Sequence, residues 1–421
     1  MFFALGQRSI AFLLSIYFKK IEIQGVKPVE EGPLIIAGNH PNMALDPLLI
    51  LASYPRSLHF LAKSSLFSNP VANWFLRACH LIPVYRRTDR SPDQTNDKTF
   101  DEVQRLLSNR QAVTIFPEGT SVEGRTVLRL KTGAARMAFL SEERNNWSLG
   151  VKIQPVGITY AHFLGWNSGV AIAVGEPIVV DSFRELYERD PIKAVHRLTE
   201  SLELALKHLS VHVDQSHLAP LINAIHQIFT RSGRISEVDT ASLSRIAHAV
   251  ATLAPLYPEK ASEFLSRARM LLSVPISGEL PRWFLLALPA IALGNLIHII
   301  PYQVTAHLAG SLSPDEHQRG MYTFFVGTGV FFAWYALLMI VLLVIGAGFW
   351  TAFLLAGAGA LGVFAGRALP LWRVFLLSLV LPSSVRALNV LQDELIDELL
   401  EYAERVGEAG TNGDGVGELI H

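Results

Sequence analysis

The chain has 421 residues, a formal net charge of −1 and a single cysteine, and this length suggests about two or three domains. The charge balance excludes a general nucleic-acid binder, which needs clustered Lys and Arg, and one cysteine excludes an intrachain disulfide and any multi-cysteine metal site. Half of the residues are hydrophobic and only 17% are charged, whereas a soluble domain carries about 25%, so a wholly soluble protein is also excluded.

The chain begins with an apolar stretch at residues 2–18, which Lys19 and Lys20 follow. A secretory signal would show an early basic region and a cleavage site of small residues, and neither is clear here. We predict that residues 1–19 form an interfacial helix, with its apolar face at a membrane surface. A buried helix of the adjoining globular domain is the alternative.

Residues 20–190 alternate between short runs rich in β-branched side chains and helical patterns. This alternation predicts an α/β domain, in which a mixed, mostly parallel sheet has flanking helices. The intervening helical patterns include residues 100–107 and 132–141. The predicted strands are residues 21–26, 34–39, 58–62, 81–85, 112–116, 152–160 and 170–174.

The rest of the chain is predicted to be helical and then membrane-embedded. Residues 191–281 carry amphipathic patterns rich in Ala and Leu, whereas only seven of the 111 residues from 282 to 392 are charged. Since about 20 apolar residues cross a bilayer, this region holds about three transmembrane helices. These spans lie near residues 284–304, 322–345 and 349–366, and an acidic tail at 393–421 follows them.

A possible catalytic pair follows the second predicted strand. His40 is able to act as a general base near neutral pH, and a carboxylate on its other ring nitrogen would orient it. Asp46 is the candidate. However, two side chains that are six residues apart on one helix point about 120° away from each other. They meet only if His40 lies outside the helix, and Pro41 favours this because it disfavours helical backbone in the preceding residue. A turn histidine beside a solvated aspartate is the alternative.

Three more polar groups stand at strand ends or a helix start, each with an ordinary structural explanation as well. Adjacent guanidiniums at Arg86 and Arg87 suit a phosphate or form a solvated charge pair. The motif Glu118-Gly119-Thr120 offers a carboxylate and a close backbone approach, or a tight turn. Lys131 opens a predicted helix whose N-terminal amides favour anions, or is an exposed lysine.

Taken together, these motifs resemble the blocks of the glycerophospholipid acyltransferase family, which includes the lysophosphatidate and glycerol-phosphate acyltransferases. The resemblance covers about residues 20–200 and is closest to the extended fungal-type glycerol-phosphate/dihydroxyacetone-phosphate acyltransferases. The five blocks occur in family order as Asn39-His40-Pro41-Asn42-Met43-Ala44-Leu45-Asp46, Ile82-Pro83-Val84-Tyr85-Arg86, Phe116-Pro117-Glu118-Gly119-Thr120, Lys131-Thr132-Gly133-Ala134 and Gln154-Pro155-Val156-Gly157-Ile158.

The resemblance implies transfer of a fatty acyl group to a hydroxyl of glycerol-3-phosphate or 1-acylglycerol-3-phosphate. The donor would be acyl-CoA or acyl carrier protein, with no other cofactor and no metal. His40 would be the general base and Asp46 its orienting partner. Residues that match the acceptor-binding blocks are Arg86, Arg87, Glu118, Gly119, Thr120 and Lys131.

The sequence departs from the family pattern in ways that concern the acceptor more than the reaction. Five residues separate His40 from Asp46 where the family has four, a form that resembles the fungal-type subset. Ser121 stands where many members have an arginine, and Arg125 is a candidate to replace that phosphate contact. A helical segment and membrane spans follow the domain, whereas short bacterial members end there.

Two other readings remain open, a lysophospholipid remodelling enzyme and a non-catalytic lipid-binding protein on the same scaffold. In every case the partners are membrane lipids and not nucleic acid. As an integral membrane acyltransferase, the chain would hold its catalytic domain on the cytoplasmic face, because acyl-CoA and acyl carrier protein are found there.

Overall fold

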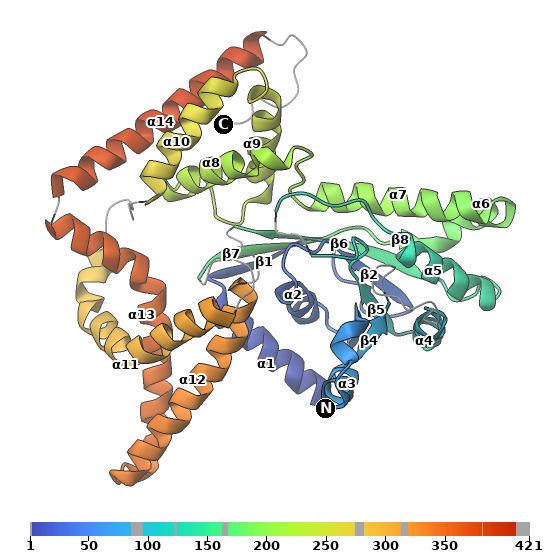
Figure 1. The fold of residues 1–421 in the computed structure, drawn as a ribbon, viewed down its shortest axis with the longest axis horizontal. Coiled ribbons are helices and arrows are strands. Elements are labelled where there is room, and N and C mark those ends of the chain that lie inside the picture. Colours follow the sequence, from blue (N-terminus) through green and yellow to red (C-terminus); the bar gives the residue numbers. More distant parts are fainter. Residues whose placement is uncertain are drawn as a thin grey trace. The chain divides into compact units, whose positions relative to one another are not determined.

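The computed structural model describes residues 2–85, 96–121, 124–161, 167–273, 282–312, 319–380 and 382–409. The chain forms two compact units, each described here by itself (Figure 1). The sheet unit comprises Met1–Leu14, Ile21–Tyr160 and Val170–His212. The helical unit comprises Ser15–Lys20, Ala161–Gly169 and Val213–His421.

The sheet unit is built on an eight-stranded sheet in the order β1-β7-β6-β2-β5-β3-β4, with β8 paired to β6. The pairs β2–β5, β2–β6, β3–β4 and β3–β5 are parallel, and only β7 and β8 run antiparallel to β6. This confirms the predicted mixed, mostly parallel sheet with flanking helices. The strands are β1 (Lys20–Gly25), β2 (Leu34–Gly38), β3 (Leu58–Lys63), β4 (Leu81–Val84), β5 (Ala112–Ile115), β6 (Lys152–Tyr160), β7 (Gly169–Val174) and β8 (Ile178–Val179).

Strand β2 lies at the centre of the sheet, where it pairs with β5 on one side and β6 on the other. All five of its residues are buried, as expected for an apolar strand with parallel neighbours on both sides. Its Leu34 pairs with Ala112 of β5 and with Lys152 of β6. The carboxyl ends of β2 and β5 therefore meet at one edge of the sheet, where open α/β sheets place their ligand sites.

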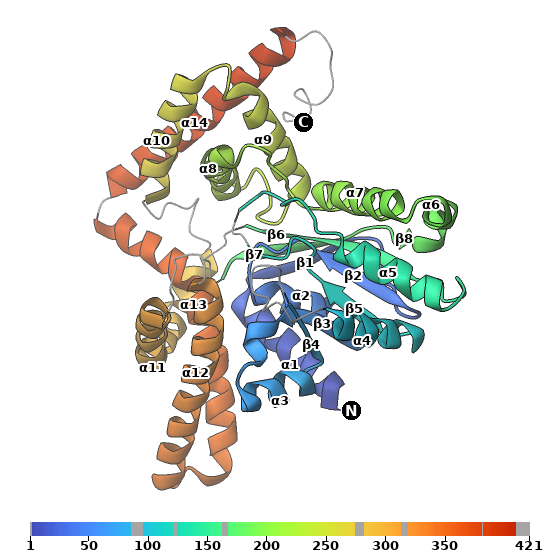
Figure 2. The same cartoon turned by 45° about the vertical axis from the view of Figure 1, so that its right-hand side comes forward.

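Helices pack against this sheet and complete its core (Figure 2). An apolar cluster joins strands β2 and β5 to helices α4, α5 and α7, and includes Ile35, Val113, Phe139 and Leu198. The helices that start in this unit are α1 (Phe2–Tyr17), α2 (Leu45–Ser53), α3 (Pro70–Ala78), α4 (Asp97–Ser108), α5 (Gly133–Arg144), α6 (Arg184–Arg189) and α7 (Pro191–Leu209).

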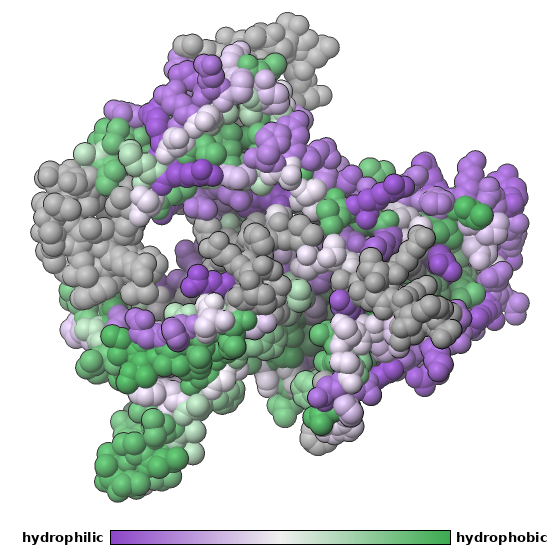
Figure 3. Space-filling model, in the orientation of Figure 1, coloured by the Kyte–Doolittle hydropathy of each residue, from purple (hydrophilic) through white to green (hydrophobic). Residues whose placement is uncertain are grey.

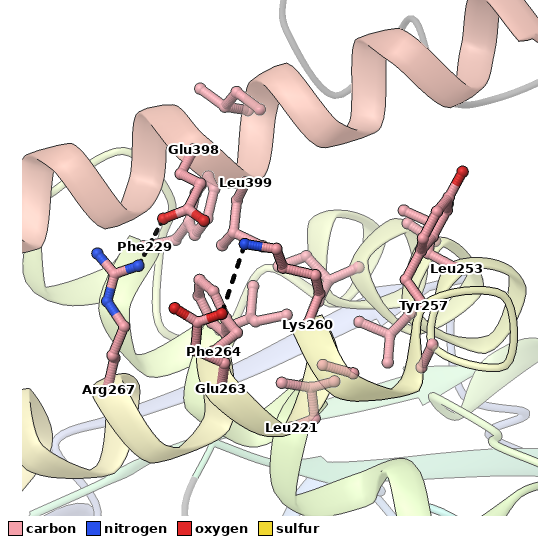
Figure 4. Close-up of a pocket in the computed structure, with 17 residues that line it drawn as sticks. Leu221, Phe229, Leu253, Tyr257, Lys260, Glu263, Phe264, Arg267, Glu398 and Leu399 are labelled. Carbon is pink, nitrogen blue, oxygen red and sulfur yellow. Dashed lines mark hydrogen bonds and ion pairs between the residues drawn. The ribbon is translucent and has the colours of Figure 1, made fainter.

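In the helical unit, four helices surround a mostly apolar cavity of about 120 Å³ (Figure 4). Ion pairs join Arg267 to Glu398 (2.6 Å) and Lys260 to Glu263 (3.4 Å) along its lining. None of the predicted site residues lines it. The four helices are α8 (Ala219–Arg231), α9 (Thr240–Leu253), α10 (Pro258–Ser273) and α14 (Pro382–Ala409). Helix α14 thus takes up the first part of the predicted acidic tail, and residues 410–421 lie outside the described residues.

The remaining helices of this unit are α11 (Arg282–Leu312), α12 (Arg319–Val344) and α13 (Thr351–Val380). Two segments within them, Leu286–Leu312 and Tyr322–Val344, are long and apolar enough to cross a membrane, and Phe353–Ala368 is a shorter apolar helix. These segments correspond to the three predicted spans. Figure 3 shows the end at which α12 meets α13 as hydrophobic surface.

A buried histidine ties two of these helices together. His298 of α11 contacts the carbonyl oxygen of Gly294 through Nδ1 (2.8 Å) and the Tyr335 hydroxyl of α12 through Nε2 (2.8 Å). Polar contacts between helices satisfy groups that would otherwise be costly in hydrocarbon. Helix packing therefore accounts for this polar residue within a predicted span.

Candidate active site

The structure brings His40 and Asp46 together at the carboxyl end of β2. His40 lies in the loop between β2, which ends at Gly38, and α2, which begins at Leu45. Its Nδ1 is 2.8 Å from Asp46 Oδ2, and the side chains are 11% and 0% exposed. His40 therefore lies outside the helix, the condition that the six-residue spacing imposes.

Asp46 is held by two further hydrogen bonds. The Asn42 backbone N–H donates to Oδ2 (2.7 Å), and the Tyr160 hydroxyl at the end of β6 donates to Oδ1 (2.6 Å). Burial raises the Asp46 pKa, while the hydrogen bonds from His40, Tyr160 and Asn42 favour the carboxylate and oppose that shift. An ionised Asp46 accepts the Nδ1 proton of His40, which leaves Nε2 as the proton acceptor.

The orientation of the His40 ring is fixed from a second direction. The Phe116 ring stacks on it, with centroids 4.0 Å apart and an interplanar angle of 14°. The backbone N–H of His40 donates to Glu118 Oε1 (3.0 Å). Among the described residues, Nε2 has no hydrogen-bond partner. The ring is thus positioned with one nitrogen available to a substrate.

Glu118 connects the His40 loop to the loop that follows β5. Its Oε2 accepts the Leu128 backbone N–H (3.2 Å), so each carboxylate oxygen binds a main-chain amide. The side chain is 5% exposed. Burial raises its pKa, and the two backbone hydrogen bonds oppose the shift. This geometry favours a role in positioning His40 and the loop.

Gly119 and Lys131 lie against each other in the same loop. Gly119 has a φ of +71°, which favours glycine, and a Cβ at this position would collide with the end of the Lys131 side chain. The Lys131 backbone N–H also donates to the Pro117 carbonyl oxygen (2.8 Å). Lys131 is exposed and Thr120 is half-buried, so a cation stands beside the loop that carries Glu118.

The structure does not describe every predicted residue. Arg86 and Arg87 lie outside the described residues, which stop at Tyr85 just beyond β4. Arg125 is 4% exposed and donates to the Tyr160 carbonyl oxygen (3.4 Å), and burial lowers its pKa to about 10. Its guanidinium is therefore directed at the end of β6.

The part of the chain that holds these motifs is similar to known proteins. Residues 20–159 match the family model named Acyltransferase. This part of the chain is an Acyltransferase-family domain. The site described above lies within it, apart from Tyr160, which directly follows the matched residues.

Three similar proteins illustrate the match. The chain is 30% identical over 135 residues to glycerol-3-phosphate O-acyltransferase 2 of Saccharomyces cerevisiae, covering 32% of this chain but only 18% of that protein. It is 28% identical over 185 residues to the 1-acyl-sn-glycerol-3-phosphate acyltransferase of Borreliella burgdorferi, covering 42% and 69%. The solved 1-acyl-sn-glycerophosphate acyltransferase of Thermotoga maritima aligns at 20% identity with a TM-score of 0.34, covering 48% and 79%.

The sequence did not predict the contacts that three residues of the acyltransferase domain make in and around the site. Tyr160 and Phe116 have the contacts given above, and the Asn39 side chain bonds both the N–H (2.7 Å) and the carbonyl oxygen (3.0 Å) of Ile158. All three lie in or directly beside the recognised blocks. That proximity is the signal by which they could have been found.

Three apolar or weakly polar residues near the site are exposed. Trp74 and Phe75 are 71% and 58% exposed, and Cys79, the single cysteine, is exposed as well. All three belong to α3 or the turn after it, where the apolar side chains face outward.

The Tyr160 hydroxyl provides a test of how the pair is held. Tyr160→Phe removes the donor to Asp46 Oδ1, and a hydrogen bond to a charged group contributes about 1.5–3 kcal/mol. We expect kcat for acyl transfer to fall about tenfold or more, with KM for the acyl donor unchanged. The matched control is Tyr187→Phe, which removes a hydroxyl that donates to Glu143 on the surface. Equal kcat values in the two variants would contradict this role.

Proposed function

We propose that this chain is a membrane-bound O-acyltransferase that moves a fatty acyl group to a hydroxyl of glycerol-3-phosphate or 1-acylglycerol-3-phosphate. The observation that carries the proposal is the His40–Asp46 pair, 2.8 Å apart, inside an Acyltransferase-family domain. The donor is acyl-CoA or acyl carrier protein. The relatives named above act on these acceptors, according to their names, and support the choice.

The proposed chemistry needs a base and no covalent intermediate. Nε2 of His40 takes the proton of the acceptor hydroxyl as its oxygen attacks the thioester carbonyl. The buried Asp46 carboxylate stabilises the imidazolium that forms. When the tetrahedral intermediate collapses, the C–S bond breaks and the imidazolium returns the proton to the thiolate. The products are an ester and a free thiol.

The acceptor phosphate is assigned to the cationic residues of the family blocks. Arg86 and Arg87 supply forked donors that suit a phosphate, and Lys131 adds a positive charge beside Gly119 and Thr120. Glu118 holds the loop that joins this region to His40. The proposed site thus combines cationic residues for the phosphate with the His40 base for the hydroxyl.

We propose that this reaction takes place at a membrane surface. Helices long enough to span a bilayer and the membrane-lipid acyltransferases among the relatives point to association with a membrane. We place the acyltransferase domain on the cytoplasmic face, where thioester donors are present. The acceptor or product then exchanges directly with the lipid phase.

Replacing Arg86 tests the phosphate assignment. Arg86→Ala removes charge-assisted hydrogen bonds, which contribute about 1.5–3 kcal/mol each, so KM for a phosphate acceptor should rise about tenfold or more. The acyl-CoA KM should stay constant. Arg189→Ala, an exposed arginine on α6, serves as the control. An acceptor KM no higher than that of the control would show the assignment to be wrong.

An acceptor panel tests the function itself. The full chain in nanodiscs is incubated with labelled acyl-CoA and, in turn, glycerol-3-phosphate, dihydroxyacetone phosphate, 1-acylglycerol-3-phosphate, lysophosphatidylcholine and glycerol. Mass spectrometry then identifies each ester. We expect product with a bare-phosphate acceptor and little with glycerol. Product only with lysophosphatidylcholine would favour a remodelling enzyme, and no product at all would favour a lipid-binding protein.

A further inference from the structure

Helix α3 of the sheet unit presents its apolar side outward. Val71, Trp74 and Phe75 are 75%, 71% and 58% exposed, and their spacing places them on one face of a helix. No described side chain of α3 is buried. In an ordinary amphipathic surface helix the apolar side faces the core, whereas the apolar face of α3 formed by Val71, Trp74 and Phe75 is exposed.

An ion pair joins α3 to the rest of the domain. Arg77, three residues after Trp74, donates two hydrogen bonds to the carboxylate of Glu102 in α4 (3.0 and 2.9 Å). Leu76 is partly buried, whereas Asn73 is exposed like the aromatic side chains. The face formed by Val71, Trp74 and Phe75 is therefore the apolar surface that α3 leaves exposed.

The apolar face continues onto neighbouring parts of the same unit. Leu5 and Phe12 of α1 are each 64% exposed, and α1 is fixed to the end of α2 by hydrogen bonds from Gln7 to two backbone carbonyl oxygens. Figures 1 and 2 both show the N-terminal end of α1 beside α3. Met43, in the loop between His40 and Asp46, is 48% exposed.

The charges of these segments identify the kind of surface that fits them. Residues 1–21 and 47–85 contain no Asp or Glu and carry six cations: Arg8, Lys19, Lys20, Arg56, Lys63 and Arg77. Two of them are ion-paired, Lys19 with Glu237 and Arg77 with Glu102. Exposed Trp and Phe beside basic residues are typical of a helix that lies in the headgroup region of an anionic bilayer. The same chain also contains two helices that are long and apolar enough to cross a membrane.

We infer that α3 is a membrane-docking helix that inserts Val71, Trp74 and Phe75 into the interface of an anionic phospholipid bilayer. Together with α1, it holds the acyltransferase domain against the lipid surface independently of the spanning helices. The inference rests on the geometry of α3 and not on the proposed reaction. A test that rejects docking by α3 therefore does not reject the catalytic role of His40, and the reverse also holds.

The lone cysteine makes a direct test straightforward. In a Cys79→Ser background, Trp74→Cys and Asn73→Cys each carry one environment-sensitive nitrobenzoxadiazole label. Asn73 is exposed and lies on the opposite side of α3. The full chain is reconstituted in phosphatidylglycerol nanodiscs with or without lipids that carry a doxyl quencher on the acyl chain. We expect blue-shifted, strongly quenched emission at position 74 and water-like, weakly quenched emission at position 73.

Two results would overturn the inference. Water-like emission without quenching at position 74 would mean that the face stays in solvent. Blue-shifted emission that doxyl lipids leave unquenched would mean that protein covers it, either another part of this chain or a second copy. Activity of the unlabelled chain, measured in parallel, reports on the proposed function and not on docking.

Discussion

His40→Ala is expected to lower kcat for acyl transfer about 10²- to 10⁴-fold, the range associated with loss of a positioned general base. The fold should survive, because alanine keeps the backbone N–H that donates to Glu118. Asp46 also keeps its bonds from Asn42 and Tyr160. The measurement is initial-rate acyl transfer at saturating donor and acceptor, with the thermal unfolding midpoint recorded for each variant.

The matched control for this variant is His196→Ala, an exposed histidine on α7. It should retain wild-type kcat. If His40→Ala kept the rate of the control while folding normally, His40 would not be the base, and the proposed mechanism would fail even if the chain made the ester.

Asp46→Asn is expected to lower kcat about 10²- to 10³-fold, a loss typical for removal of one electrostatic contact to a transition state. The hydrogen bonds determine how the new amide orients. Oδ2 accepts the Asn42 backbone N–H as well as contacting His40, so the amide oxygen must stay on that side. The amide nitrogen then faces the Tyr160 hydroxyl, which is able to accept a hydrogen bond.

In this orientation the variant keeps the His40 tautomer and loses only the negative charge. We therefore expect the donor and acceptor KM values to stay near those of the wild type while kcat falls. A kcat unchanged by Asp46→Asn would show that the carboxylate charge does not stabilise the reacting imidazole. Comparable increases in both KM values would indicate instead that the variant had distorted the site.

The same variant has a predicted effect on stability, with a defined sign. Burial raises the pKa of Asp46 above its ordinary value of 3.8, so the folded state binds the proton more tightly than the unfolded state. This contribution to the free energy of unfolding grows as pH falls through the raised pKa and levels off below 3.8. Asp46→Asn removes it.

Unfolding midpoints of the two proteins, measured across the acidic range, check this sign. As the pH is lowered, the unfolding midpoint of the wild type should rise relative to that of Asp46→Asn. Asp46 also helps to raise the pKa of Glu118, so Asp46→Asn weakens that shift as well, and this second effect has the same sign. If the two midpoints changed in parallel with pH, or if the wild-type midpoint fell relative to that of Asp46→Asn in acid, the assigned direction of the Asp46 pKa shift would be wrong.

The framework of the sheet was predictable because its strands are strong local signals. The run at β2 is apolar throughout and the run at β6 spans nine residues, and both were located within a residue or so. The two-residue strand β8 and the six-residue helix α6 were missed. Helix α6 has fewer than two turns, and strand β8 has only one alternation of inward and outward side chains. Periodicity therefore does not reveal either element.

The site was predictable where its geometry is local. Pro41 separates His40 from α2, and a spacing of six residues was enough to anticipate the pair. The contact between Tyr160 and Asp46 joins residues 114 positions apart, and the Phe116 stack also crosses from β5 to β2. Such contacts depend on which strands are neighbours, and this order is a property of the sheet and not of any one segment.

The direction of α3 illustrates the same limit. Its apolar residues have helical spacing, which ordinarily predicts a face directed to the core. In the structure Val71, Trp74 and Phe75 are exposed instead, and Arg77 pairs with Glu102 of α4. The side of α3 that meets the domain thus depends on long-range packing and not on the helical spacing alone.

A single-turnover experiment tests the central claim, direct acyl transfer promoted by His40, most directly. Excess full-length protein in nanodiscs is mixed with labelled acyl-CoA with and without glycerol-3-phosphate or 1-acylglycerol-3-phosphate, then quenched and analysed for ester, free thiol and acyl-protein. The account predicts that thiol release requires acceptor, equals ester formation, leaves no label on the protein and is lost in His40→Ala. Acyl-protein that forms without acceptor, or ester formed by His40→Ala at the wild-type rate, would contradict it.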